Sequence, residues 1–206
     1  MNILLLGATG RVGSHILEFA LGEGHHVKVL VRNPENMQTD NKNLDVTEGN
    51  VLNEMDIQNA IKGTDLVISA LGTDGTTTLT DSMPLIIRTM KEEDIKRIIT
   101  IGTAGILQSR MEPGYLRYQS SESKRKTTRA AEEHHKVYEL LEDSGLDWTI
   151  VCPTYLPDGA HTGEYRVGRD YLPEEGKMIS VPDTAEFAFS QVEDDNYIKS
   201  RVGIAY

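Results

Sequence analysis

The sequence predicts an α/β fold in which one open, mostly parallel sheet is flanked by helices. Short runs rich in Val, Ile and Leu alternate with amphipathic segments of helix length, as expected for parallel strands that crossover helices bury on both faces. A glycine-rich turn directly follows the first apolar run. The length of 206 residues suits one hydrophobic core. We therefore expect a single doubly wound domain spanning residues 1–206.

The expected elements follow from the position of each apolar run. Six runs are predicted strands, at residues 2–6, 26–31, 44–49, 66–71, 97–102 and 148–153. Five amphipathic segments are predicted helices, at residues 11–22, 53–62, 80–93, 127–144 and 184–192. Gly145 is expected to end the fourth helix in a left-handed conformation. Asp183 and Glu186 have the spacing of a capping box and are expected to begin the last helix.

Two long connections interrupt this order. Residues 103–126 follow the fifth predicted strand, and residues 153–177 follow the sixth and hold turn residues around a small hairpin. Ligands bind at the carboxyl ends of strands in such sheets, and long loops in compact domains usually carry function. We therefore expect the binding site beside these two connections.

The composition excludes several classes of protein. The chain carries 21 Lys and Arg against 32 Asp and Glu, a net charge of -11, which disfavours nucleic acid or an anionic membrane as a partner. No apolar run reaches the ~20 residues of a membrane span, and the first residues lack the basic start of a signal peptide. The single cysteine, Cys152, lies in an apolar stretch and is predicted to be a buried structural thiol. These features predict a cytoplasmic protein.

The glycine-rich turn GATGRVG predicts a dinucleotide site. Gly7 ends the first strand and permits a tight turn, Gly10 lets a pyrophosphate approach the backbone, and Gly13 allows the helix to pack closely on the strand. The pyrophosphate would lie over the amides at the start of helix 11–22. The strand before the turn and the helix after it supply the context that this motif requires. The intervening residues are expected to contact the cofactor as well, namely Ala8, Thr9, Arg11 and Val12.

The end of the second predicted strand indicates which dinucleotide is bound. A carboxylate at this point would bind the free 2′-hydroxyl of an NAD ribose. The chain has Arg32 there, and a guanidinium suits a 2′-phosphate in charge and geometry. Arg11 is expected to approach the same phosphate. The sequence thus favours NADPH over NADH, and the alternative is that both arginines are solvated surface charges.

Further segments extend the pattern over nearly the whole chain. The glycine turn is followed in order by VLVRNPE, GNVLN, DLVISALGT, SGLDWTIVCPTYLPDG, TGEY and MISVPDTAEF. With these segments the chain resembles the atypical short-chain dehydrogenase/reductases of the NAD(P)H-binding, NmrA-like group. Within that group it is most similar to the NADPH-dependent flavin reductases that also reduce biliverdin-IXβ. The resemblance implies a Rossmann domain that binds NADPH, and it favours a monomer.

The resemblance also implies which residues contact the cofactor. Asn50 stands where the family commonly has Asp, and an amide can still contact the edge of adenine. Asn50 and Val51 would contact the adenine. Leu71, Gly72 and Thr73 would contact the middle of the cofactor. The nicotinamide would contact Pro153, Thr154, Tyr155 and Leu156.

Two residues are candidates for the reaction itself. Thr103 stands where the flavin reductases have a serine near the nicotinamide, so a hydroxyl is kept. We expect Thr103 to orient the nicotinamide or the substrate. Tyr155 stands where those enzymes have a histidine, and it either donates a proton or only packs against the cofactor.

The Tyr-x-x-x-Lys pair that reduces carbonyls in many short-chain dehydrogenases is absent, since no tyrosine has a lysine four positions later. This absence disfavours carbonyl and sugar-nucleotide chemistry. It does not disfavour hydride transfer, because the cofactor supplies the hydride and the protein aligns two rings. We expect an NADPH-dependent oxidoreductase whose acceptor is a small planar molecule, a free flavin or else a quinone or bilin. The alternative is a redox-sensing regulator that binds NADP(H) without turnover.

Adjacent histidines give no metal site. His134 and His135 point about 100° apart on a helix, and no spaced ligand completes a site, so no metal is predicted.

Tyr115 and Tyr118 either cover a planar substrate or pack on the surface.

A basic cluster lies at the end of the first long connection. It is interpreted as a solvated helix start, and attraction of an anionic substrate is the alternative. Its members are Lys124, Arg125, Lys126 and Arg129.

Overall fold

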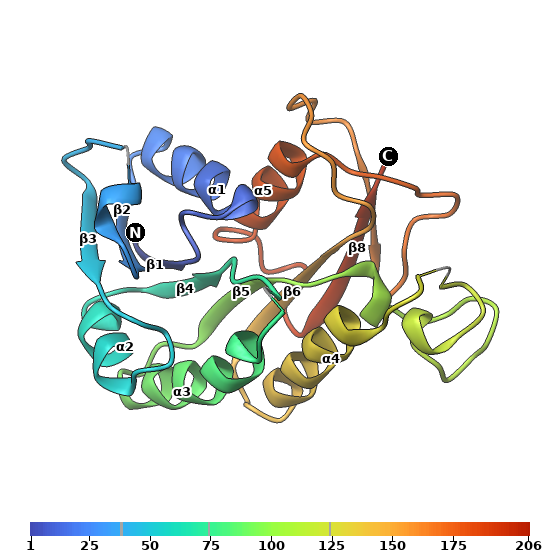
Figure 1. Cartoon of the computed structure of the whole chain (residues 1–206). Helices are drawn as coiled ribbons and strands as arrows, with labels where there is room; N and C mark the ends of the chain where they lie inside the picture. Colours follow the sequence, from blue (N-terminus) through green and yellow to red (C-terminus); the bar gives the residue numbers. More distant parts are fainter. Residues whose placement is uncertain (38, 74, 124) are drawn as a thin grey trace.

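Strands form the centre of the molecule, and helices cover both faces of their sheet (Figure 1). The structure is a computed structural model, and it describes residues 1–37, 39–73, 75–123 and 125–206. In these residues eight strands pair in the order β3-β2-β1-β4-β5-β6-β8-β7. All neighbours are parallel except β7, which runs antiparallel to β8. The predicted doubly wound α/β fold is therefore confirmed.

The strands have the bounds β1 Asn2–Leu6, β2 His26–Val31, β3 Leu44–Glu48, β4 Leu66–Ser69, β5 Arg97–Ile101, β6 Asp147–Pro153, β7 Arg166–Arg169 and β8 Ser200–Ala205. The helices are α1 Arg11–Gly22, α2 Glu54–Ile61, α3 Thr78–Glu92, α4 Arg129–Glu142 and α5 Val181–Ser190. The elements that the sequence predicted begin and end within three residues of these bounds. Gly145, expected to end α4, has a left-handed φ of +76°, which confirms that prediction.

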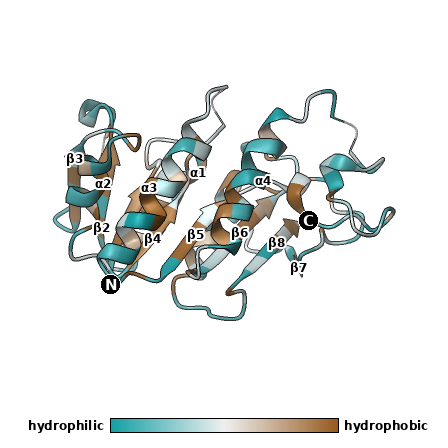
Figure 2. Cartoon of the chain, turned by 90° about the horizontal axis from the view of Figure 1, so that it is seen from below, coloured by the Kyte–Doolittle hydropathy of each residue, from teal (hydrophilic) through white to brown (hydrophobic). Residues whose placement is uncertain are grey.

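Alternate strand residues enter two separate hydrophobic layers. In β1, Ile3 and Leu5 pack in the layer that includes α1 and α5, whereas Leu4 and Leu6 pack in the layer of α2, α3 and α4. Figure 1 shows these helix groups on opposite faces of the sheet. Figure 2 shows hydrophobic residues concentrated in the strands and hydrophilic residues on the outer sides of the helices. No helix in the described part of the chain is long and apolar enough to cross a membrane.

Strands β7 and β8 are absent from the six predicted strands. Strand β8 contains Arg201, which is only 4% exposed. The guanidinium donates to the carbonyl oxygen of Ile106 at 2.6 Å and lies 4.3 Å from the centre of the Tyr138 ring. Gly203 is required in the same strand because a Cβ there would lie 2.4 Å from the carbonyl oxygen of Tyr171. A buried cation and a glycine thus interrupt the apolar run by which a central strand is recognised.

Cys152 lies in β6 and is a free, buried thiol. Burial raises its pKa to about 12, so the reactive thiolate does not form near neutral pH. The prediction of a structural thiol is confirmed.

Helix α5 begins earlier than the sequence predicted. Ser180 is its N-cap, and the Ser180 hydroxyl accepts a hydrogen bond from the backbone N–H of Asp183 at 3.2 Å. Pro182 stands in the first turn, where a missing N–H leaves no helical hydrogen bond unmade. The predicted cap at Asp183 is wrong, because a serine three residues earlier takes that position.

Asp183 instead holds the loop that follows β6. Its fully buried carboxylate accepts hydrogen bonds from Thr162 through the backbone N–H and the hydroxyl, each at 2.7 Å, and from the Gly163 N–H at 3.0 Å. The Tyr206 hydroxyl donates a fourth at 2.5 Å. Burial alone would raise the pKa of this carboxyl, but the hydrogen bonds outweigh it and lower the pKa to about 2.

Replacing Asp183 with Asn should lower the free energy of unfolding by about 3 kcal/mol at pH 7, because four donors lose a charged acceptor that is itself fully buried. The folded-state pKa is depressed, so this stabilisation is complete above the ordinary value of 3.8 and is lost as the pH falls through about 2. The difference between the proteins should therefore shrink between pH 4 and pH 2. Urea unfolding followed by circular dichroism measures it.

Asp158→Asn is the matched control, because its side chain is 89% exposed. It should change the unfolding free energy by less than about 1 kcal/mol. Equal losses in both variants would contradict a structural role for Asp183.

Candidate functional site

The site lies where the connections of the sheet reverse direction. Strand β2 pairs with one side of β1 and strand β4 with the other. The connections after β1 and after β4 therefore lead toward opposite edges of the sheet. Such a reversal opens a crevice at the carboxyl ends of parallel strands, and ligands bind there. The glycine turn follows β1 at this point, and Ala70 follows β4.

Backbone atoms meet in this crevice without side chains between them. Gly7 has a φ of +82°, and a Cβ on it would lie 2.6 Å from the carbonyl oxygen of Ala70. A Cβ on Gly13 would lie 2.1 Å from the carbonyl oxygen of Gly7. The structure therefore gives Gly7 and Gly13 the tight turn and the close packing that the sequence predicted.

The start of helix α1 is open to an anion. Gly10 is the N-cap and has no side chain that could accept from the first amides. The first turn also holds no acidic residue. Free N–H groups and the positive end of the helix dipole suit a pyrophosphate, so these residues fit a dinucleotide.

Two pockets border the turn, and a third lies beyond them. The first, called the β2 pocket, has a volume of about 260 Å³. Arg32 lines it and is exposed, and no hydrogen bond or ion pair joins it to any other described residue. The Asn50 side-chain oxygen accepts from the Leu52 N–H at 3.0 Å, which leaves the NH₂ group of that amide as a donor. Predicted cofactor residues in this pocket are Gly7, Thr9, Gly10, Arg32, Asn50, Val51, Leu71 and Gly72.

The second pocket, called the central pocket, has a volume of about 470 Å³ and lies between the turn and the ends of β4, β5 and β6. Predicted cofactor residues that line it are Gly10, Arg11, Val12, Leu71, Gly72, Thr73, Pro153, Thr154 and Leu156. The candidate catalytic residue Thr103 lines it too. Ala8 lines neither pocket, because its side chain is 2% exposed and packs in the core.

Arg11 and Arg32 do not share a pocket. The Arg11 guanidinium donates to the Asp158 carboxylate at 2.7 Å and to the carbonyl oxygen of Leu156 at 2.9 Å. These bonds hold Arg11 at the central pocket, whereas Arg32 lines the β2 pocket. The structure therefore does not bring the two arginines into one pocket, and their sharing of one phosphate stays a prediction.

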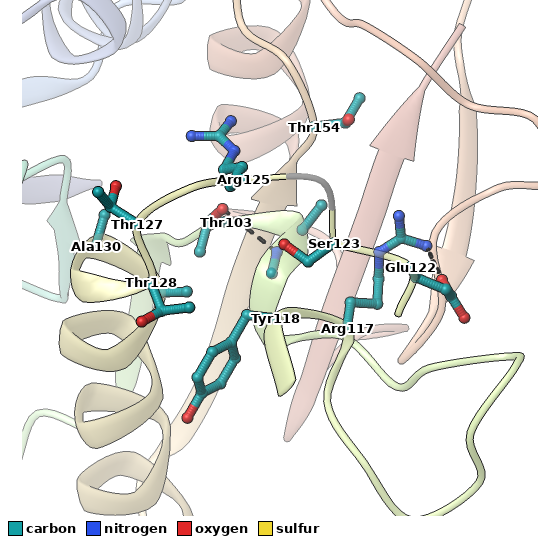
Figure 3. A pocket seen from close by; sticks show the side chains of 13 residues that line it. Thr103, Arg117, Tyr118, Glu122, Ser123, Arg125, Thr127, Thr128, Ala130 and Thr154 are labelled. Atoms are coloured by element: carbon teal, nitrogen blue, oxygen red, sulfur yellow. Dashed lines mark hydrogen bonds and ion pairs between the residues drawn. The ribbon is translucent and has the colours of Figure 1, made fainter. Parts of the chain in front are cut away.

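The third pocket, called the loop pocket, has a volume of about 190 Å³ and is formed by the first long connection and the start of α4 (Figure 3). Arg117 points toward Glu122 in Figure 3 and forms an ion pair with it at 2.6 Å, so its charge is already compensated. Tyr118 lines the pocket and its hydroxyl is 2.9 Å from His135 Nδ1, whereas Tyr115 is 56% exposed and lies outside. Of the basic cluster, Arg125 lines the pocket, and Lys124 falls outside the described residues.

The loop pocket adjoins the central pocket. Four residues line both, namely Thr103, Arg125, Ala130 and Thr154. Thr103 follows β5, and its hydroxyl oxygen accepts from the Gly105 N–H at 3.4 Å, as Figure 3 shows. The hydroxyl proton remains available to a ligand on either side.

Tyr155 does not reach these pockets. It is 59% exposed and lines none of the three, although Thr154 and Leu156 on either side of it do. Its carbonyl oxygen pairs with the Ile179 N–H at 3.0 Å. In extended backbone, successive side chains point to opposite sides. Because Thr154 points into the pockets, Tyr155 points away from them.

His134 lines the central pocket and was not among the predicted site residues. It is 9% exposed, and burial lowers its pKa to about 4. It lies on the same helix face as the buried residues Val137 and Leu141. The helical period of α4 is the sequence signal that places it on the inner face.

A cluster of potential metal ligands lies apart from these pockets. His161 Nε2 is 3.4 Å from a Glu186 oxygen and 3.9 Å from an Asp183 oxygen. Each Asp183 oxygen already accepts two hydrogen bonds. These hydrogen bonds hold the loop after β6 in place, and this structural role explains why the three side chains lie together.

The turn, the helix start and the pockets define a dinucleotide-binding protein of the Rossmann class. The sequence model of a family described as NAD(P)H-binding matches residues 7–195. Because this match spans most of the chain, the protein belongs to the NAD(P)H-binding family.

Known proteins share the fold over its whole length. YwnB of Bacillus subtilis (strain 168), named as uncharacterized, is 26% identical over 199 residues, which are 94% of this chain and 92% of its own. A Bacteroides thetaiotaomicron structure named as a candidate epimerase is 30% identical with a TM-score of 0.86, covering 100% of this chain and 96% of its own. A Streptococcus pneumoniae structure named as a candidate NADH-flavin reductase is 24% identical with a TM-score of 0.85, covering 100% and 99%.

Gly13→Ala should abolish dinucleotide binding and lower the free energy of unfolding by more than about 2 kcal/mol, because the new Cβ would lie 2.1 Å from the Gly7 carbonyl oxygen. Gly22→Ala is the control in the same helix, where a Cβ meets no atom within 4 Å. It should leave binding intact and raise the unfolding free energy by up to about 1 kcal/mol. Calorimetric titration with NADP⁺ and urea unfolding test both variants. Normal binding by Gly13→Ala would contradict the assignment of the turn.

Proposed function

We propose that the protein is an NADPH-dependent reductase that passes hydride to a planar conjugated acceptor, in the first place a free flavin. The observation that carries the proposal is the pair of adjoining pockets, since four residues line both the central and the loop pocket. Such a pair can hold the nicotinamide and an acceptor next to each other. The Streptococcus pneumoniae relative named as a candidate NADH-flavin reductase supports the choice of a flavin.

The β2 pocket and the central pocket each suit one part of NADPH. The pyrophosphate would lie over the start of α1, and the nicotinamide would enter the central pocket. The adenosine would then occupy the β2 pocket, where Arg32 has no competing partner among the described residues. A guanidinium there favours a 2′-phosphate over a free 2′-hydroxyl.

Bound NADPH supplies the hydride, and the chain's own residues arrange the two rings. Thr103 lies at the boundary of both pockets, so its hydroxyl can orient the nicotinamide or the acceptor. The proposal gives Tyr155 no proton transfer, because its side chain lines neither pocket. A flavin, quinone or bilin accepts hydride into a conjugated system and can take its proton from solvent. Alignment and exclusion of water therefore suffice for the reaction.

Purified protein should consume NADPH steadily when free FMN or riboflavin is added, because an acceptor bound in the loop pocket would lie beside the hydride donor. The loss of NADPH absorbance measures this turnover, with a quinone and biliverdin as further acceptors. Gly22→Ala should keep the activity and Gly13→Ala should lose it, which excludes a contaminating reductase. Tight NADP(H) binding without consumption for every acceptor would contradict the enzyme and support the redox-sensing regulator.

Arg32→Gln should raise the Kd for NADPH about 10-fold or more, because a charge-assisted hydrogen bond to the 2′-phosphate is lost. The Kd for NADH should stay within about twofold, since that cofactor has no phosphate to lose. Arg88→Gln is the matched control, because Arg88 pairs with Glu54 away from the three pockets. Fluorescence titration measures each affinity. Equal weakening of NADPH and NADH binding would exclude Arg32 as the group that reads the phosphate.

A further inference from the structure

Arg125 is a charged group that the proposed function leaves without a role. It lies in the connection before α4 and lines both the central pocket and the loop pocket. Thr103, Ala130 and Thr154 also line both, and none of them carries a charge. Figure 3 shows Arg125 beside Thr103 at the edge of the loop pocket. A cation therefore lies at the boundary that the hydride would cross.

The charge of Arg125 is not balanced within the described part of the chain. No other described residue forms a hydrogen bond or an ion pair with its side chain. The other arginines that line these two pockets are already paired. Arg117 is 2.6 Å from the Glu122 carboxylate, and Arg11 is 2.7 Å from the Asp158 carboxylate. The guanidinium of Arg125 thus remains available to a ligand.

The anionic groups of NADPH have other places to bind. We assign its pyrophosphate to the start of α1 and its 2′-phosphate to Arg32 in the β2 pocket. The nicotinamide end of the cofactor carries no anion, and its ring becomes a cation once the hydride has left. The anionic partner of Arg125 is therefore to be sought in the acceptor.

The reaction that we propose creates a negative charge on the acceptor. The C4–H bond of the dihydronicotinamide breaks, and the hydrogen leaves with both electrons to form a new bond on the acceptor ring. A neutral flavin becomes an anion in this step, because the proton from solvent arrives separately. A fixed cation beside a developing negative charge lowers the barrier, since it interacts more strongly in the transition state than before. A guanidinium stays charged at neutral pH and offers several N–H donors in one plane.

We propose that Arg125 is a catalytic residue that stabilises the negative charge forming on the acceptor during hydride transfer. The inference rests on the proposed function, because it needs the nicotinamide in the central pocket and the acceptor in the loop pocket. It holds for a flavin or a quinone alike, since either becomes an anion when it accepts a hydride. Arg125 is exposed in this structure. Ligands in both pockets would shield it from water and so strengthen its electrostatic effect.

Arg125→Gln should slow hydride transfer from NADPH to riboflavin about 10-fold or more, measured by stopped-flow absorbance in a single turnover. The Kd values for riboflavin and NADPH should stay within about twofold, because the charge that Arg125 meets exists only during the reaction. Arg125→Lys keeps the charge without the planar donors and should restore part of the rate. Arg129→Gln is the matched control, since it removes a cation of the same basic cluster that lines none of the three pockets. It should keep the wild-type rate.

A second measurement does not depend on turnover. The dye 8-hydroxyriboflavin ionises in its ring with a change of colour, so its pKa reports the charge around a bound flavin. With saturating NADP⁺ in every sample, the pKa of the bound dye should be lower by about 1 in wild-type protein than in Arg125→Gln, because a nearby cation favours the anionic ring. Arg129→Gln should match the wild-type protein. The dye has no phosphate, so the effect isolates the charge at the ring.

Several results would overturn the proposal while the reductase remains. The first is an equal pKa of the bound dye in wild-type protein and Arg125→Gln. The second is a loss confined to FMN, seen as weaker FMN binding with riboflavin unaffected, which would assign Arg125 to the phosphate of that flavin. The third is weaker NADPH binding with an unchanged hydride rate, which would assign it to the cofactor. Equal rate losses in Arg129→Gln would indicate a general effect of surface charge. Absence of both turnover and dye binding in wild-type protein would instead overturn the proposed function, and this inference with it.

Discussion

The approach of helix α1 to the end of strand β1 is the contact on which the site depends. Gly13 lies so near the Gly7 carbonyl, and Gly7 so near the Ala70 carbonyl, that a methyl group on either glycine would overlap backbone atoms. Three backbone segments thus meet directly. This contact brings the free amides at the start of α1 to the crevice between β1 and β4, where we propose that the cofactor binds.

The charge of the site differs from the charge of the whole protein. A net charge of -11 repels an anionic dinucleotide at long range, but ionic screening limits that repulsion to about 8 Å at physiological salt. Arg11, Arg32 and Arg125 line the pockets themselves. Local cations and oriented amides can therefore decide binding.

Short stretches of sequence predicted the elements around the glycine turn well. Strands β1 and β2 and helix α1 could be predicted to the residue, because an apolar run, a glycine and a regular helical period mark their ends. The errors arise where partners come from distant segments. The buried Arg201 of β8 is satisfied by Ile106 and Tyr138, and Arg11 by Asp158. A resemblance aligns Tyr155 with a site position, yet the side to which it points depends on the extended backbone after β6.

The loop pocket has a consequence for how such a protein can change over evolutionary time. Its walls come mainly from a connection and the first turn of α4, which carry none of the pairing between strands. If the loop pocket holds the acceptor as proposed, substitutions in these walls alter the accepted molecule while the sheet and the glycine turn stay as they are. Gly7 and Gly13 have no such freedom, since one added carbon on either overlaps the backbone. Proteins that descend from one ancestor with this fold can therefore keep the same cofactor and differ in the acceptor that they reduce.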